Sequence, residues 1–268
     1  MAIRVNIVTL RLALALALPS SAAVIAGCGA PQVGEQTYAE AAELAFAESE
    51  RAFDRKDYEL ARARFQRVYA EYPYSELAAI AQLRIADCFR AERVHLRAIE
   101  QYRRFIRSHP SHQRVPEAEF NIALSYADQM PNDVFLLPPA HERDLSETEN
   151  AYRALRVFLS EHGDSPFAGE AEQLLVRTRE RLAAYELYTA EFYVRRDNMR
   201  GAAQRATFLI DNYPDSVQVP PALFLLGRAM TELGDVVQAT SHLQRLVSEY
   251  PEHALTVEAL DWLAQYAP

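Results

Sequence analysis

The feature that most constrains this chain is an internal repeat of five units. Each unit contains an aromatic residue or histidine followed by proline or glycine, and these pairs serve as anchors for the register. Alanine stands eleven residues before every anchor and nine residues after it, and larger apolar residues stand four before and thirteen after. Small and large columns at these offsets predict helices whose side chains interdigitate. The anchors are Tyr72-Pro73, His109-Pro110, His162-Gly163, Tyr213-Pro214 and Tyr250-Pro251.

The spacing of the anchors indicates the type of repeat. Anchors lie 37 residues apart at both ends of the array (72 to 109 and 213 to 250), close to the roughly 34 residues of a tetratricopeptide helix-turn-helix unit. We therefore expect an all-α superhelix of five tetratricopeptide-type repeats with a C-terminal capping helix. Stacked units of this type form an extended concave surface suited to binding a peptide or another domain. The expected repeats are 38–71, 75–108, 114–162, 165–212 and 216–249, followed by the cap at 252–266.

The two middle spacings are longer, 53 residues (109 to 162) and 51 residues (162 to 213). The first excess falls in residues 129–147, which contain Met130-Pro131 and Pro138-Pro139 and predict a loop inserted between the helices of the third unit. The second excess falls in Ala168 to Arg196, where the helical apolar spacing continues. It predicts one helix about twice the usual length of about 11–12 residues.

Residues 1–27 have the composition of an export signal. Arg4 and Arg11 stand at the front, and the apolar, small-residue segment from Leu12 to Gly27 is too short for a transmembrane helix. The segment ends at Cys28 and resembles a bacterial lipoprotein signal, in which Val24 to Cys28 would form the lipobox. That resemblance implies removal of residues 1–27 and acylation of the Cys28 thiol. An ordinary secretory signal followed by an accidental cysteine is the alternative.

The expected mature chain begins at Cys28. By the same resemblance, the residue after the cysteine influences sorting, and Gly29 is not the aspartate associated with inner-membrane retention. We therefore expect a lipid anchor in the outer membrane of the cell, with the protein on its periplasmic face. Residues 28–37 would form a flexible linker, and residues 38–268 the repeat domain.

Composition and missing motifs exclude several classes of function. The net charge of −9 disfavours nucleic acid as a partner. No phosphate-binding glycine loop, metalloprotease histidine pair, cysteine pair or nucleophile elbow occurs, so we expect no enzyme, no catalytic residue and no cofactor. His109 and His112 offer only two donors at a turn, so no metal is expected. Cys88 is interpreted as a small buried apolar residue of a helix.

Three stretches resemble a specific family, namely residues 104–112, residues 181–186 and Ala190 to Tyr193. They are similar to the end of the second repeat and to the long fourth-repeat helix of the BamD lipoproteins, which belong to the outer-membrane β-barrel assembly machinery. The resemblance extends from Cys28 to about Ala259 and includes the interrupted third repeat. Other envelope scaffolds of this repeat class, such as a pilotin or the cell-division coordinator CpoB, remain alternatives, as does a regulatory subunit of an envelope enzyme.

The resemblance implies a set of partners. Members of the family dock the last periplasmic POTRA domain of the barrel protein BamA through their C-terminal repeats, and accessory lipoproteins of the machinery also bind them. Their N-terminal repeats receive unfolded outer-membrane barrel proteins. In the family, an arginine eight residues before the fourth Tyr-Pro pairs with an acid on BamA, and Arg205 occupies that position here. The alternative for Arg205 is a solvated helix residue.

Two aromatic residues are candidates for the substrate end. Tyr72 and Tyr74 flank Pro73 in the first repeat, and their rings could pack against side chains of an extended segment. Core packing is the alternative, especially for Tyr72, because its column is aromatic or histidine in every repeat. At the other end of the chain, Trp262 and Tyr266 are expected to cap the last core, with contact to a partner as the alternative.

Overall fold

The computed structural model describes residues 33–131 and 143–266, and within them it contains helices and no strand. Residues 1–32, which include the expected signal peptide and Cys28, lie outside the described residues. The helices are α1 (Val33–Asp54), α2 (Tyr58–Glu71), α3 (Glu76–Ala91), α4 (His95–Ser108), α5 (Val115–Ala127), α6 (Ser146–His162), α7 (Ala168–Arg195), α8 (Met199–Asn212), α9 (Val219–Glu232), α10 (Val236–Glu249) and α11 (Leu255–Tyr266).

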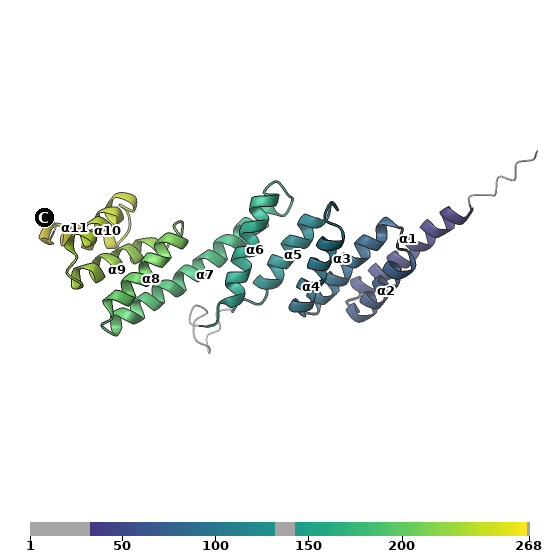
Figure 1. Cartoon of the computed structure of the whole chain (residues 1–268), viewed down its shortest axis with the longest axis horizontal. Coiled ribbons are helices and arrows are strands. Elements are labelled where there is room, and N and C mark those ends of the chain that lie inside the picture. Colours follow the sequence, from purple (N-terminus) through teal and green to yellow (C-terminus); the bar gives the residue numbers. More distant parts are fainter. Residues whose placement is uncertain (1–32, 132–142, 267–268) are drawn as a thin grey trace, which may run out of the picture.

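The helices form an elongated array in which each helix packs against the next one in the chain (Figure 1). Pairs of successive odd-numbered helices also contact each other, namely α1 with α3, α5 with α7, α7 with α9 and α9 with α11. The odd-numbered helices therefore line the more crowded, concave side of the stack. This arrangement confirms the predicted all-α fold of the tetratricopeptide type.

The alanine columns form the interior of the array. Each of their ten members has no exposed surface, and the larger residues four positions before the anchors are at most 1% exposed. Alanine lets adjacent helices approach closely, while the neighbouring large side chain fills the remaining space. The register read from the anchors is therefore confirmed. The ten residues are Ala61, Ala98, Ala151, Ala202 and Ala239 before the anchors, and Ala81, Ala118, Ala171, Ala222 and Ala259 after them.

Four repeats close with the same three-residue turn between their two helices. Its central residue has a positive φ: 62° at Lys56, 60° at Arg93, 57° at Asp197 and 81° at Gly234. This left-handed residue ends the first helix and directs the chain into the second. The third repeat differs, because α5 ends at Ala127 and α6 begins only at Ser146.

Two expected boundaries shift. Of the loop predicted at 129–147, residues 132–142 lie outside the described residues, and residues 146 and 147 already belong to α6. Helix α1 begins at Val33, so its first turn takes up the end of the linker expected at 28–37. The predicted long helix is α7, which has 28 residues.

Helix α7 joins two separate cores. Its first half places Leu174 in a core shared with Phe120 of α5 and Phe158 of α6. Its second half places Leu182 in the C-terminal core, which contains residues of α8 and α9 and the partly buried Trp262 of the cap. No helix in the described ranges combines the length and the apolar character needed to cross a bilayer.

Candidate partner-binding surfaces

A groove of about 790 Å³ lies at the N-terminal end, between the turn that follows α2 and the turn that follows α4. Small side chains of α3 form its floor, and aromatic and histidine side chains form its walls. Tyr74 is 95% exposed at this groove, so its whole ring is available to a ligand. The lining includes Tyr69, Tyr74, Ala78, Ile80, His109 and His112.

Tyr72 and Tyr74 have different environments. Tyr72 packs into the first core, and its ring lies 5.4 Å, edge to face, from that of Tyr38. Its backbone N–H donates to the carbonyl oxygen of Val68 and so ends α2. Of the two tyrosines, only Tyr74 lines the groove. The structure therefore supports the packing alternative for Tyr72 and leaves Tyr74 as the aromatic candidate.

The two histidines at this groove have partners within the protein. Nε2 of His109 lies 3.0 Å from Oε1 of Gln82, and Nδ1 of His112 accepts a hydrogen bond of 3.1 Å from the backbone N–H of Arg114. Burial lowers the pKa of His109, and the nearby His112 lowers it further. His109 is thus mainly neutral at pH 7 and presents the faces and edges of its ring rather than a charge.

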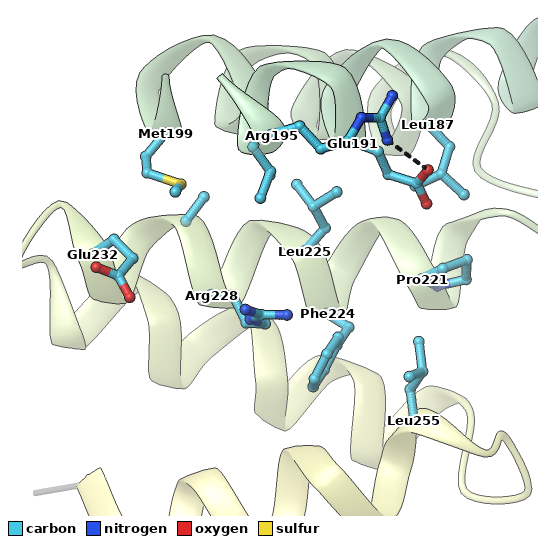
Figure 2. A pocket seen from close by; sticks show the side chains of 12 residues that line it. Leu187, Glu191, Arg195, Met199, Pro221, Phe224, Leu225, Arg228, Glu232 and Leu255 are labelled. Atoms are coloured by element: carbon cyan, nitrogen blue, oxygen red, sulfur yellow. Dashed lines mark ion pairs between the residues drawn. The ribbon is translucent and has the colours of Figure 1, made fainter. Parts of the chain in front are cut away.

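A second groove, of about 420 Å³, lies at the C-terminal end between α7, α9 and α11 (Figure 2). Leu225 of α9 points toward α7 in this view, and Leu255 of α11 lies below. The lining is mostly apolar, and Arg195 and Glu191 form an ion pair of 3.9 Å at its rim. Arg228 also lines the groove and has no ion pair within the described residues.

Arg205 lies on α8, close to this end of the array. Its Nη1 donates a hydrogen bond of 3.1 Å to Oε2 of Glu186 on α7, nineteen residues earlier in the chain. The side chain of Glu186 is only 9% exposed, whereas that of Arg205 is 41% exposed. Nε and Nη2 of Arg205 make no hydrogen bond within the described residues. Glu186 therefore holds the guanidinium in place while leaving donors free for a second carboxylate.

The electrostatics of Glu186 depend on Arg205. Burial raises the pKa of Glu186, and Arg205 counteracts that shift by its charge and its hydrogen bond. The neighbouring Tyr213 is also affected: burial, together with the charges of Glu186 and Glu149, raises its pKa to about 12. The cluster is thus a buried carboxylate with one partly exposed cation, which is an arrangement that depends on the arginine.

Little reactive chemistry is visible at either end. Burial raises the pKa of the Cys88 thiol to about 12, so the thiolate is scarcely populated at pH 7. The turn that contains His109 and His112 gathers no third metal donor among the described residues.

The C-terminal groove cannot be predicted from the repeat pattern. Its lining comes from four helices, α7, α8, α9 and α11, and Leu187, Phe224 and Leu255 occupy no common repeat column. The sequence does contain apolar residues of the last repeat that line this groove. A periodic pattern assigns such residues to the core, because it does not distinguish buried from partly exposed positions.

Comparison with known proteins gives a consistent result. Residues 38–236 match the model of the YfiO family, which is described as outer membrane lipoprotein. Residues 221–253 also match a tetratricopeptide-repeat model. The first match covers well over half of the chain and includes Arg205, Glu186 and the N-terminal groove.

The curated relatives carry one name. A protein of Xylella fastidiosa strain 9a5c, named outer membrane protein assembly factor BamD, is 30% identical over 197 residues, which are 72% of this chain and 67% of the relative. In a second strain of that species the match covers 65% of the relative, slightly less than two thirds of its length. The BamD of Vibrio cholerae is 26% identical over 182 residues, 66% of this chain and 75% of the relative.

Solved structures are more distant. The TPR2AB domain of yeast Sti1, in complex with pHSP90, is 12% identical, and the overlap covers 85% of this chain and 86% of that chain with a TM-score of 0.40. The fold assignment rests on the helix pairing described above and not on this overlap.

Proposed function

This chain belongs to the YfiO family of outer membrane lipoproteins, and from that premise we propose that it is a non-enzymatic scaffold of outer-membrane protein assembly. Membership of the family associates it with the outer membrane. The proposal adds that Cys28 carries the lipid anchor and that the repeats face the periplasm. Several acyl chains on one cysteine would hold the protein firmly, because each buried methylene contributes about 0.8 kcal/mol.

The C-terminal repeats would dock a POTRA domain of BamA, and accessory lipoproteins would join the same complex. Arg205 supports this contact, because its free Nε and Nη2 donors can take a carboxylate from the partner while Nη1 stays on Glu186. The nearby groove between α7 and α9 provides apolar surface that a partner could bury, which a single charged contact does not provide. The single observation that carries this part of the proposal is the partly exposed Arg205 held by a buried carboxylate.

The N-terminal repeats would receive unfolded barrel proteins. Such chains expose alternating apolar side chains and unpaired strand edges. The groove at Tyr74 provides an exposed ring, a floor of Ala78 and Ile80, and the neutral ring of His109. Tyr69 extends this surface and is 39% exposed. The two ends of the array could then hold a machinery subunit and its substrate together.

One binding experiment tests both ends. The full chain in mild detergent is titrated with the POTRA domains of BamA and, separately, with a urea-denatured barrel protein. We expect the double variant E186Q/R205Q to lose about tenfold or more in POTRA affinity and to keep substrate binding, since a charged hydrogen bond contributes about 1.5–3 kcal/mol. We expect Tyr74→Ala to show the opposite pattern.

The variants serve as controls for each other. Replacing Glu186 together with Arg205 avoids leaving a buried carboxylate without its cation, so a loss of binding does not reflect unfolding. Arg97→Gln removes an exposed charge from α4 that lines neither groove and should leave both affinities unchanged. Equal POTRA binding by wild type and E186Q/R205Q would exclude Arg205 from the interface.

A further inference from the structure

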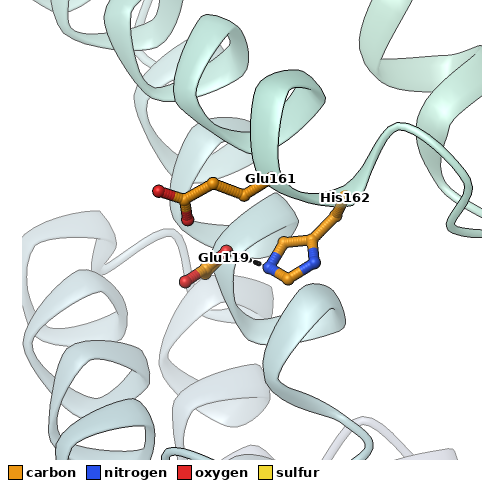
Figure 3. Close-up of side chains that lie close together, drawn as sticks. All are labelled: Glu119, Glu161 and His162. Atoms are coloured by element: carbon orange, nitrogen blue, oxygen red, sulfur yellow. Dashed lines mark ion pairs between the residues drawn. The ribbon is translucent and has the colours of Figure 1, made fainter.

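Three potential metal ligands meet between the helices of the third repeat. Glu119 belongs to α5, and Glu161 and His162 end α6. One donor atom from each lies within 4.8 Å of the other two (Figure 3). The same figure shows the three side chains converging on one place from the two helices.

Glu119 and His162 are in close contact across the two helices. Nε2 of His162 lies 2.8 Å from Oε2 of Glu119, and both side chains are about three quarters buried. That oxygen is shielded from solvent, and the contact is an ion pair when the imidazole is protonated. The His162 ring is held on its other side by Phe158, at 5.7 Å between centroids. Two good metal-donor atoms therefore lie side by side, 2.8 Å apart.

Glu161 supplies the third donor. Its side chain is exposed and has no ion pair within the described residues, so it can turn toward the cluster at little cost. The cluster lies at the last turn of α6, where the free backbone carbonyls of a helix favour a cation.

The position of the cluster in the third repeat matters for the fold. The other four repeats close with a three-residue turn, whereas α5 and α6 are separated by the inserted segment between Ala127 and Ser146. Glu119 lies near the start of α5 and His162 at the end of α6, so the cluster is at the end of the helix pair opposite to that segment. A cross-link there would hold together the one helix pair that lacks a short connection.

We propose that Glu119, Glu161 and His162 bind a divalent transition-metal ion of the Zn²⁺ type, which fastens α5 to α6. One imidazole nitrogen and two carboxylates are suitable ligands for Zn²⁺, and a water molecule would complete four-coordination. Mg²⁺ and Ca²⁺ are disfavoured because they require about six or more oxygen ligands. This inference revises the expectation from sequence that the chain binds no metal, and it does not depend on the proposed function.

The test uses the full chain in mild detergent, freed of metal by a chelator, and titrated with Zn²⁺ alone and with Co²⁺ alone. We expect one equivalent of Co²⁺ to give the strong visible absorption of a four-coordinate site. Zn²⁺ at about a hundredfold excess over its Kd should raise the melting temperature by about 5 °C. Mg²⁺ and Ca²⁺ should give neither effect.

The decisive variant is Glu161→Gln, because Glu161 makes no ion pair within the described residues and its loss should leave the metal-free melting temperature unchanged. It should weaken Zn²⁺ binding at least tenfold, and His162→Gln should weaken it further. The double variant H109Q/H112Q is the matched control and should bind Zn²⁺ as the wild type does. Full Zn²⁺ binding by Glu161→Gln and His162→Gln, or loss of binding in H109Q/H112Q, would overturn the proposal.

Discussion

Arg205 illustrates how a surface charge can depend on a buried neighbour. The resemblance to a known family placed this arginine on a helix, where it could have been an ordinary solvated side chain. In the structure it neutralises Glu186, whose side chain is 9% exposed. Removing one partner of such a pair leaves a charge in a poorly hydrated place, whereas removing both does not.

This dependence predicts the effect of single and double substitutions on stability. Arg205→Ala should lower the free energy of unfolding by about 1–2 kcal/mol, less than the 3–5 kcal/mol of a fully buried pair because the guanidinium is partly solvated. Glu186→Gln should change it by less than about 1 kcal/mol, and the double variant E186Q/R205A should behave like Glu186→Gln. Urea unfolding curves of the four proteins at pH 7 provide the measurement.

The same cluster predicts a dependence on pH. The pKa of Glu186 is raised in the folded chain, so the folded state binds this proton more tightly than the unfolded state does. Its contribution therefore lowers stability as pH rises from the ordinary carboxyl pKa through the raised one. Arg205→Ala removes the group that counteracts the raised pKa of Glu186. The loss in free energy of unfolding relative to wild type should therefore vanish in acid and grow toward neutral pH. A deficit that is independent of pH would contradict this account of the pair.

The sequence predicts the environment of some individual residues but not of others. The alanine columns could be predicted because repeat periodicity alone fixes which residues face a neighbouring helix. The partner of Arg205 could not be predicted, because it lies nineteen residues away on another helix and its burial depends on packing. Tyr72 and Tyr74 are two residues apart, and their different exposure follows from the exact course of the turn.

At the scale of the element, two helical glycines differ in whether a neighbouring helix packs against them. A Cβ at Gly227 of α9 would lie 2.6 Å from Cγ of Leu243, a fully buried residue of α10. A Cβ at Gly169, in the first turn of α7, would meet nothing within 4 Å. The first glycine permits close packing of the last repeat, whereas the second has no packing role.

These two glycines form a matched pair for mutation. Gly227→Ala should destabilise the protein by about 1–3 kcal/mol, because overpacking outweighs the gain of up to about 1 kcal/mol in helix propensity. Gly169→Ala should leave stability unchanged or raise it by up to about 1 kcal/mol. Thermal unfolding of both variants is the measurement. A stabilising Gly227→Ala would show that α9 and α10 do not pack as closely as described.

Most helices could be predicted because each anchor marks the end of one repeat. Repeats of one type also have their turns at equivalent positions. Helix α1 begins earlier than expected, since nothing in the sequence before residue 38 repeats a column that would mark its start. The candidate metal site also escaped prediction. Glu119 and His162 are far apart in the sequence, and only the antiparallel packing of α5 on α6 brings them together.

At the scale of the whole molecule, α7 determines the shape. Its 28 residues contribute to two cores and connect the N-terminal repeats to the C-terminal ones without a break (Figure 1). The order in which the helices stack in space can be predicted from the sequence, because each repeat contacts only its neighbours. The two grooves do not, because each requires side chains from elements that only the folded array brings together.

We propose that the array links a barrel-assembly subunit at its C-terminal repeats to substrate at its N-terminal repeats. The most direct measurement is a pull-down of the full-length chain from its native envelope in mild detergent, with mass spectrometry of the retained proteins. We expect recovery of a POTRA-bearing barrel protein with the wild-type chain and its loss with the E186Q/R205Q variant. Recovery of a secretin or of cell-division proteins without a POTRA-bearing protein would leave the fold intact and contradict the proposed function.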